Sequence, residues 1–320
     1  MKVFEYSKLL FSNWEKFVPR TNNGTIFHTQ TFLNYHPEGR FNHKHLIFED
    51  RGKWLGVLPG AIIIRDGKRI HASHPGASFG GIALLSDVGV KEAYRMVDLW
   101  VEWAKANKLE GLEFTRVPFI YYEFPEEHVD FAFVKHGGKA VKRELTATLH
   151  LGKTDEETFA RFIPEARTAT RKAEKAGVTV DWEGSIPEFY KILKSNLYAR
   201  HNVEPTHSLE ELLDLQRRFP GKIHQFNAVR NGEAIAGVTV WEVTPRGVIA
   251  FYISHDQTAQ EFRPLNFLFW EIFKWSISRG FEWFDFGTYT LNMEPNFGLA
   301  RFKESFGAKG IFRDTLRLIF

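Results

Sequence analysis

The stretch FDFGTYTLNMEPNFGLARFKESFGA, residues 284–308, decides the fold that we expect. It begins as an apolar strand that carries the carboxylate Asp285, turns at Gly287, and continues into a short basic helix that Gly307 closes. Strand ends and helix starts are the places where α/β proteins put their chemistry. The stretch therefore predicts an α/β fold and marks the part of it that is expected to hold the site.

The two halves of the chain repeat one order of elements. In the first half we expect strands at 45–49 and 54–64, a glycine-rich segment at 75–85, a helix at 91–107 and a strand at 109–117. In the second half we expect strands at 223–229, 234–243 and 247–254, a helix at 265–279 and a strand at 281–287. We interpret this order as a duplication of one unit with a mixed sheet.

Particular residues support the duplication. Gly56-Val57 corresponds to Gly237-Val238, and Leu112-Glu113-Phe114 corresponds to Phe284-Asp285-Phe286. Chance likeness between two amphipathic α/β halves is the alternative. We predict a first domain over residues 1–150, structural or on the acceptor side, and a second over 151–320, on the donor and catalytic side.

Helices are predicted between the repeats. The segment Thr154–Gly177 reads as a helix that Pro164 interrupts, and helices at Ile186–His201 and Ser208–Arg218 follow. Thr154 and Ser208 each precede a glutamate by three residues, which is the spacing of a capping box.

Composition limits the classes of function. The chain has 320 residues, 31 phenylalanines, no cysteine and a net charge of +3. Without cysteine there is no disulfide, thiol nucleophile or cysteine-ligated metal. The charge is far from that of a polybasic nucleic-acid binder, so we expect no DNA partner. The longest apolar run, residues 54–64, is too short to span a membrane, and we expect a cytoplasmic protein.

Several motifs in order resemble a known family. They are Arg167-x3-Arg171-Lys172-Ala173-x-Lys175-Ala176-Gly177-Val178, Gly232-Glu233-x-Ile235-Ala236-Gly237, Phe251-Tyr252-Ile253-Ser254, Asp285-Phe286-Gly287 and Gly298-Leu299-x-Arg301-Phe302-Lys303-x2-Phe306-Gly307. Together they resemble the FemAB-like and CelD-like branch of the GNAT (Gcn5-related) N-acyltransferases, in which two GNAT-like domains follow one another. The likeness rests on the order and spacing of the motifs.

The resemblance implies transfer of an acyl or aminoacyl group to an amine by direct attack, without a covalent enzyme intermediate. The donor would be acyl-CoA or aminoacyl-tRNA as co-substrate, with no tightly bound cofactor. Two neighbouring strands are expected to part, so that a backbone N–H on the edge Tyr252–Asp256 meets the developing oxyanion. The implied catalytic residues are Asp285, His255 and Lys303, and the implied donor-binding residues are Tyr252, Ser254, Arg263, Asn266 and Arg301.

One departure from the family concerns the donor. GNAT enzymes commonly bind the pyrophosphate of CoA with a glycine-rich loop before the central helix. This chain has QTAQEFRP, residues 257–264, at that place, with no glycine. Acyl-CoA and aminoacyl-tRNA therefore both stay open as donors. The alternative function is a GNAT scaffold that binds a nucleotide or RNA without catalysis.

For the acceptor side we expect a small-molecule or cell-wall-precursor amine, and tRNA as a further candidate partner. The predicted acceptor-binding residues are Arg167, Arg171, Tyr198, Arg200, His201 and His207. The alternative interpretations are a solvated helix face for the two arginines and a polar loop for the others.

Two further histidines have the spacing of metal ligands. His43 and His45 lie two apart on a strand, but no carboxylate pattern is near, so we interpret them as a surface strand and predict no metal site.

Overall fold

A computed structural model describes the backbone of all 320 residues and every side chain except those of Arg200 and His201. The chain forms two compact units, residues 1–144 with 312–320, and residues 145–311. Strands β9 (Lys139–His150) and β17 (Lys309–Ile319) cross the boundaries between them. The last residues of the chain thus belong to the N-terminal unit.

The second unit is built on a mixed sheet. Its strands are β10 (Thr179–Asp181), β11 (Ile223–Arg230), β12 (Glu233–Thr244), β13 (Gly247–His255) and β14 (Trp283–Thr288), followed in the sheet by β9 and β17. Neighbours are antiparallel from β10 to β13, β13 and β14 are parallel, and β14 and β9 are antiparallel. The predicted mixed sheet and its strands are confirmed to within two residues for β11 to β14.

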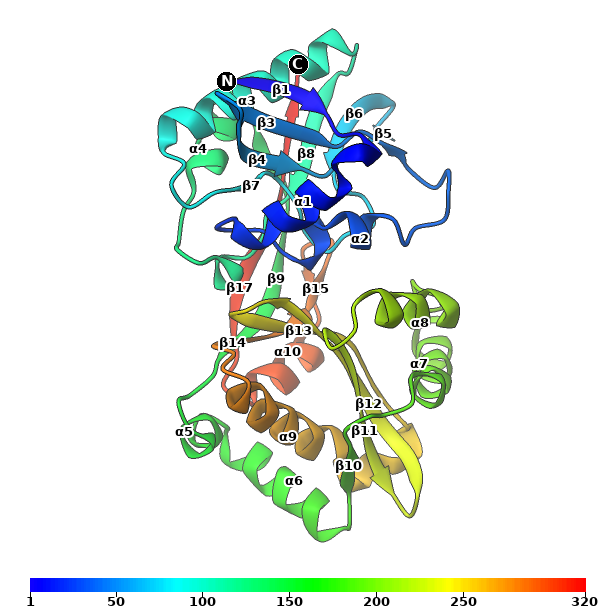
Figure 1. Cartoon of the computed structure of the whole chain (residues 1–320). Coiled ribbons are helices and arrows are strands. Elements are labelled where there is room, and N and C mark those ends of the chain that lie inside the picture. Colours follow the sequence, from blue (N-terminus) through cyan, green and yellow to red (C-terminus); the bar gives the residue numbers. More distant parts are fainter. The chain divides into compact units, whose positions relative to one another are not determined.

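Helices cover both faces of this sheet. They are α5 (Asp155–Ala160), α6 (Pro164–Lys175), α7 (Ile186–His201), α8 (Leu209–Arg218), the 3₁₀ helix η5 (Gln257–Phe262), α9 (Pro264–Ser278) and α10 (Phe297–Glu304). Figure 1 shows α7 and α8 on one side of β11 and β12, with α9 and α6 on the other. A short hairpin, β15 (Thr290–Leu291) and β16 (Glu294–Pro295), precedes α10.

Phenylalanine supplies most of the core under α9. Phe269 and Phe273 of α9 pack on Phe284 and Phe286 of β14 and on Phe306 after α10. A rigid aromatic core of this kind holds β14 and α10 against the helix.

The predicted helix starts are also observed. Ser208 accepts a hydrogen bond from the Glu211 N–H while the Glu211 side chain accepts one from Ser208 N–H, so the capping box is complete. Thr154 accepts from the Glu157 N–H at the start of α5, but the Glu157 carboxylate accepts from the Lys153 N–H instead of the Thr154 N–H, so only half of the predicted capping box forms there. The expected helix Thr154–Gly177 is two helices, because the chain turns after Ala160 and Pro164 begins α6.

The first unit contains two groups of strands. One sheet has the order β1 (Lys2–Glu5), β3 (Leu46–Asp50), β4 (Lys53–Leu58) and β7 (Ala83–Leu84). The other strands pair in the order β17, β8 (Gly111–Thr115), β6 (Lys68–Ser73), β5 (Ala61–Arg65) and β2 (Asn42–His43). The single strand expected at 54–64 is wrong: Pro59 and Gly60 separate β4 from β5, which lie in different sheets.

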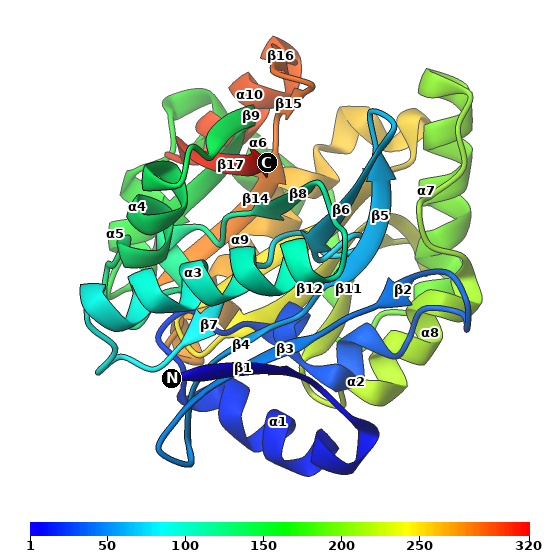
Figure 2. The ribbon, with the colours of Figure 1, turned by 90° about the horizontal axis from the view of Figure 1, so that it is seen from above.

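Short and long helices complete the first unit. They are α1 (Phe11–Phe17), α2 (Gln30–Leu33), α3 (Val90–Ala106), α4 (His128–Lys135) and the 3₁₀ turns η1 (Lys8–Leu10), η2 (Val18–Arg20), η3 (Ile26–His28) and η4 (Phe119–Tyr121). Figure 2 shows α3 lying along β4, β3 and β1. In both units a long helix, α3 or α9, precedes the second strand of a parallel pair, β6 with β8 or β13 with β14, as the duplication predicts. In the first unit the short strand β7 also lies between β6 and α3. None of the helices in the described chain has the length and apolarity that a membrane crossing requires.

Candidate functional site

The strands β13 and β14 part in the middle of the second unit. They pair only from Gly247 to Ile249 with Trp283 to Asp285, and β13 then continues to His255 beside β12 alone. A register shift between Thr239 and Val240 of β12 inserts Phe251 as an extra residue in β13. Such a bulge bends a strand and increases its twist. The strand separation expected from the sequence is therefore observed.

Alternation along β13 identifies the groups on the open side. In an antiparallel pair, residues alternate between bonding to the partner strand and directing their N–H and C=O groups away from it. The Asp256 N–H bonds to Ile235 O of the β12 side at 2.8 Å. By this alternation the N–H groups of Asp256 and Ser254 face β12. The N–H groups of His255 and Ile253 therefore point away from β12, toward the opened edge.

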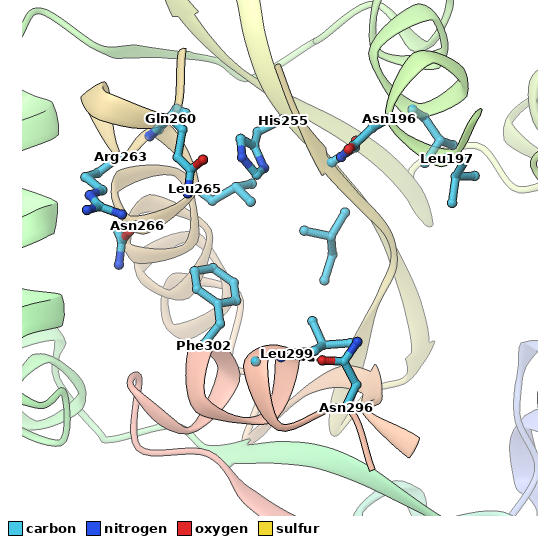
Figure 3. Close-up of a pocket in the computed structure, with 15 residues that line it drawn as sticks. Asn196, Leu197, His255, Gln260, Arg263, Leu265, Asn266, Asn296, Leu299 and Phe302 are labelled. Atoms are coloured by element: carbon cyan, nitrogen blue, oxygen red, sulfur yellow. Dashed lines mark hydrogen bonds between the residues drawn. The ribbon is translucent and has the colours of Figure 1, made fainter. Parts of the chain in front are cut away.

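A cavity of about 580 Å³ lies at this edge. Its wall comes from α7, β13, η5, the start of α9, and α10 (Figure 3). The lining residues are Leu193, Asn196, Leu197, Ile253, Ser254, His255, Gln260, Arg263, Pro264, Leu265, Asn266, Asn296, Gly298, Leu299 and Phe302. This volume is in the range of ligand pockets, and the apolar wall with a few polar groups is their usual composition.

The start of α9 gives the cavity a positive end. Arg263 has φ 54 and is the N-cap residue, and Pro264 begins the helix. Pro264 has no N–H, and the Asn266 N–H bonds to the Arg263 carbonyl at 3.0 Å, so this end of the 15-residue helix favours an anion mainly through its partial positive charge. Of the lining residues, Arg263 alone has a side chain that is always charged. A phosphate or another anion fits this end.

Amide groups connect α7 to β13 across the cavity wall. Asn196 Nδ2 donates to Ser254 Oγ at 2.9 Å, and Gln257 Nε2 donates to Asn196 Oδ1 at 2.7 Å. These bonds fix the orientation of the Asn196 amide. The α7 wall is thereby held at a defined distance from the edge of β13.

Tyr252 and His207 form a second link on β13, and neither lines the cavity. The Tyr252 hydroxyl lies 2.8 Å from His207 Nδ1 and accepts the His207 N–H, while Tyr190 donates to the His207 carbonyl. Burial raises the pKa of Tyr252 to about 12, so the phenol is protonated at neutral pH. This group holds the segment between α7 and α8 on β13.

Asp285 and Lys303 are buried away from the cavity lining. Asp285 has no exposed surface, and its carboxylate accepts from Thr146 Oγ1 at 2.5 Å and from the Gly287 N–H at 2.7 Å. Lys303 is 2% exposed and donates to the carbonyls of Gly287 and Thr288. Both side chains fix the end of β14, where the register with β9 shifts between Asp285 and Thr288. Their catalytic roles stay predictions.

The other predicted residues are dispersed. His255, Ser254, Arg263 and Asn266 line the cavity, whereas Arg301 is exposed on α10 and does not. Arg167 and Arg171 line a separate, open hollow between α5 and α6, where Arg171 lies over the Phe159 ring at 5.5 Å. Tyr198 is exposed on α7. The predicted side chains of Arg200 and His201 lie outside the described residues.

Sequence reasoning missed the apolar wall and its amides. Leu193, Asn196 and Leu197 recur at the three- and four-residue spacing of one helix face, and Leu299 and Phe302 are three apart on α10. That spacing marks a face, but it does not tell whether a cavity or a core lies under it.

Residues 160–304 match the family described as acetyltransferase (GNAT) domain. No curated protein matches the sequence significantly.

The fold has relatives among solved structures, all at low sequence identity. FemX is 12% identical with a TM-score of 0.76, covering 100% of this chain and 98% of its own. L-PGS from Bacillus licheniformis is 12% identical with a TM-score of 0.62, covering 97% and 91%. A tandem GNAT protein from the clavulanic acid biosynthesis pathway is 12% identical with a TM-score of 0.60, covering 99% and 98%. At these identities the structures share the fold.

Proposed function

We propose that the chain, which carries a GNAT acetyltransferase domain and shares its fold with FemX and a tandem GNAT protein, is an acyltransferase that moves an acyl or aminoacyl group from a phosphate-bearing carrier to an amine. The attack is direct: the amine nitrogen forms a bond to the carbonyl carbon, and the carbon–sulfur or carbon–oxygen bond to the carrier breaks.

The observation that carries the proposal is the open edge of β13 beside the cavity. The N–H groups of Ile253 and His255 face this side, and both residues line the cavity. A carbonyl placed there has a donor ready for the negative charge that develops on its oxygen. A donor held by the backbone does not have to reorganise during the reaction.

The donor's phosphate is proposed to bind at the start of α9. Arg263 and the partial positive charge at the start of the helix attract the phosphate, as described above. The helix η5 occupies the place of the glycine-rich loop, so recognition of a pyrophosphate rests on Arg263 and α9. Acyl-CoA and aminoacyl-tRNA both carry phosphates, and both are donors to be tested.

The proton of the attacking amine needs an acceptor. His255 lines the cavity and follows the proposed oxyanion donor by two residues on the same strand. We assign it the role of general base, which takes the amine proton as the carbon–nitrogen bond forms. For the acceptor we propose a primary amine on a small molecule or a cell-wall precursor.

The function is tested by incubating the protein with acyl-CoA esters and aminoacyl-tRNA, each with a panel of amines, followed by mass spectrometry. We expect an amide product and release of the free carrier. Thermal stabilisation by nucleotides or RNA without any acylated product would instead support the non-catalytic binder.

Two matched pairs of variants test the assignments. Arg263→Ala should raise the KM for the donor by about 10-fold, the equivalent of one charge-assisted contact, whereas Arg301→Ala, exposed on α10, should not. His255→Gln should lower kcat by about 10²- to 10⁴-fold, whereas His150→Gln, exposed on β9, should not. Equal effects within either pair would contradict the assignment.

A further inference from the structure

Three histidines of the first unit converge, although the sequence predicted a surface strand there. His43 is the last residue of β2, His45 directly precedes β3, and His74 directly follows β6. One nitrogen from each ring lies within 4.8 Å of the others. His74 was not among the sequence candidates because it lies about thirty residues further along the chain.

The distance between two of the rings matches metal ligation. His74 Nε2 lies 3.2 Å from His43 Nδ1. Two nitrogens that share one tetrahedral zinc ion at ordinary bond lengths are about 3.3 Å apart. A metal would therefore need little movement of these two side chains.

The three rings lie largely out of contact with solvent. His45 and His74 are buried and His43 is half-buried. The rings of Phe41 and His36 pack against His74 and narrow the space around it.

The neighbouring His71 shows what a purely structural histidine looks like here. Its Nδ1 accepts from Trp100 Nε1 at 2.8 Å, and its Nε2 lies 2.7 Å from the Lys44 carbonyl. Both ring nitrogens are used. His43 and His74 instead have their facing nitrogens directed at each other.

We propose that His43, His45 and His74 form a binding site for a divalent transition metal, for which Zn²⁺ is the best fit. Three imidazoles suit zinc, whereas magnesium and calcium require oxygen ligands. Water takes the fourth position from the side of the half-buried His43. The ion connects segments that lead into both strand groups of the first unit, so it stabilises that unit.

His45 contributes least to the affinity. The Gly60 N–H donates to His45 Nδ1 at 3.0 Å, which leaves Nε2 for the metal. Ligation at Nε2 moves the ring proton to Nδ1, and the Gly60 N–H then loses its acceptor. Because this hydrogen bond is lost on metal binding, we expect His45 to contribute less to zinc affinity than His43 or His74.

The test uses the protein without a histidine tag, freed of metal with a chelator and titrated with Zn²⁺, Co²⁺ or Mg²⁺. We expect one equivalent of Zn²⁺ to bind, Co²⁺ to give the visible absorption of a tetrahedral complex, Mg²⁺ to have no effect, and Zn²⁺ to raise the Tm. His43→Gln and His74→Gln should each lower zinc affinity by at least about 100-fold, more than the loss of an outer-shell partner, and His45→Gln by less.

Controls separate loss of the site from loss of the fold. His150→Gln should bind zinc as the parent does, and the Tm of each variant without metal shows whether it is folded. Zinc affinity that is unchanged in His74→Gln, or no zinc binding by the parent protein at micromolar concentration, would overturn the proposal.

Discussion

The parallel strand pair of each unit ends differently. In the first unit β6 pairs with β8 from Ile70 to Ser73, the last residue of β6. In the second unit β13 leaves β14 after Ile249 and runs on to His255. The cavity at the end of β6 is about 140 Å³, and the one at β13 is about 580 Å³. The parallel pair thus stays hydrogen-bonded to the end of β6 in the first unit, whereas in the second unit the strands separate and leave an open edge.

The carboxylates at the corresponding positions of the two units have different partners. Glu113 of β8 forms ion pairs with Arg317 at 2.6 Å and Arg65 at 3.2 Å. Asp285 of β14 accepts hydrogen bonds from Thr146 and from Gly287 of its own strand. Two arginines pair with the carboxylate of the first unit, whereas the carboxylate of the second unit bonds the irregular end of its own strand beside the gap. The fold alone does not create the site; the separation of the strands does.

The largest expected difference between the units is their response to acid. His28 and His71 of the first unit are fully buried, and burial lowers the pKa of each to about 4. Their contribution to stability is complete above the unfolded pKa of about 6.5 and is lost as the pH falls toward 4. By pH 5 the free energy of unfolding should drop by on the order of 4 kcal/mol for the pair.

Urea unfolding at pH 7 and pH 5, with chelator present, measures this loss, and hydrogen exchange assigns it to a unit. We expect the first unit to open first at pH 5. Equal stability at both pH values would show that these histidines do not titrate on unfolding.

Removing one N–H from the open edge of β13 tests whether this edge is needed for activity. Ile253→Pro deletes an N–H that points away from β12, so the ladder with β12 keeps its bonds. We expect kcat to fall by about 10²- to 10³-fold, as for the loss of an oxyanion donor. Ile253→Val keeps the N–H and should retain activity. If the proline variant is folded by its Tm and fully active, the oxyanion assignment fails.

Replacing the corresponding carboxylates of the two units by amides tests whether Asp285 has a catalytic role in addition to a structural one. Glu113→Gln and Asp285→Asn each weaken bonds to a buried group, and we expect a loss of about 1–3 kcal/mol in the free energy of unfolding for each. Only a catalytic role of Asp285 would lower kcat further than its effect on stability accounts for. Thermal unfolding and steady-state kinetics on both variants distinguish the two outcomes.

The smallest effect is expected at a pair of glycines. A Cβ on Gly237 would lie 2.3 Å from a ring carbon of Phe189 on α7, whereas a Cβ on Gly56 would lie 3.0 Å from Ile82. Gly237→Ala should therefore cost about 1–3 kcal/mol by overpacking, and Gly56→Ala less. Comparing the Tm of both variants tests how closely α7 packs on β12. Equal Tm values would indicate that α7 moves to accommodate the methyl group.

Local patterns predicted most of the fold. The strands β11 to β14, the helices α7 to α9 and the caps at Thr154 and Ser208 follow from periodicity and short-range chemistry, which depend on neighbouring residues. The break between β4 and β5 was marked by Pro59 and Gly60, but an apolar run on both sides concealed it.

The site was predictable only in part, because its walls meet through long-range packing. His255, Ser254, Arg263 and Asn266 follow from the order of motifs along one segment. Asn196 on α7 reaches Ser254 only through the packing of the helix on the sheet. In the same way, no local pattern indicates that Thr146 bonds to Asp285 or that His74 meets His43.

The final strand has a consequence for how the protein is made. Residues 315–319 of β17 pair with β8, so a segment that is synthesised after the whole second unit completes the first unit. Until then β8 has a bare edge, and such an edge can pair with another chain and aggregate. A nascent chain of this protein therefore depends on the second unit being synthesised before the first can finish folding.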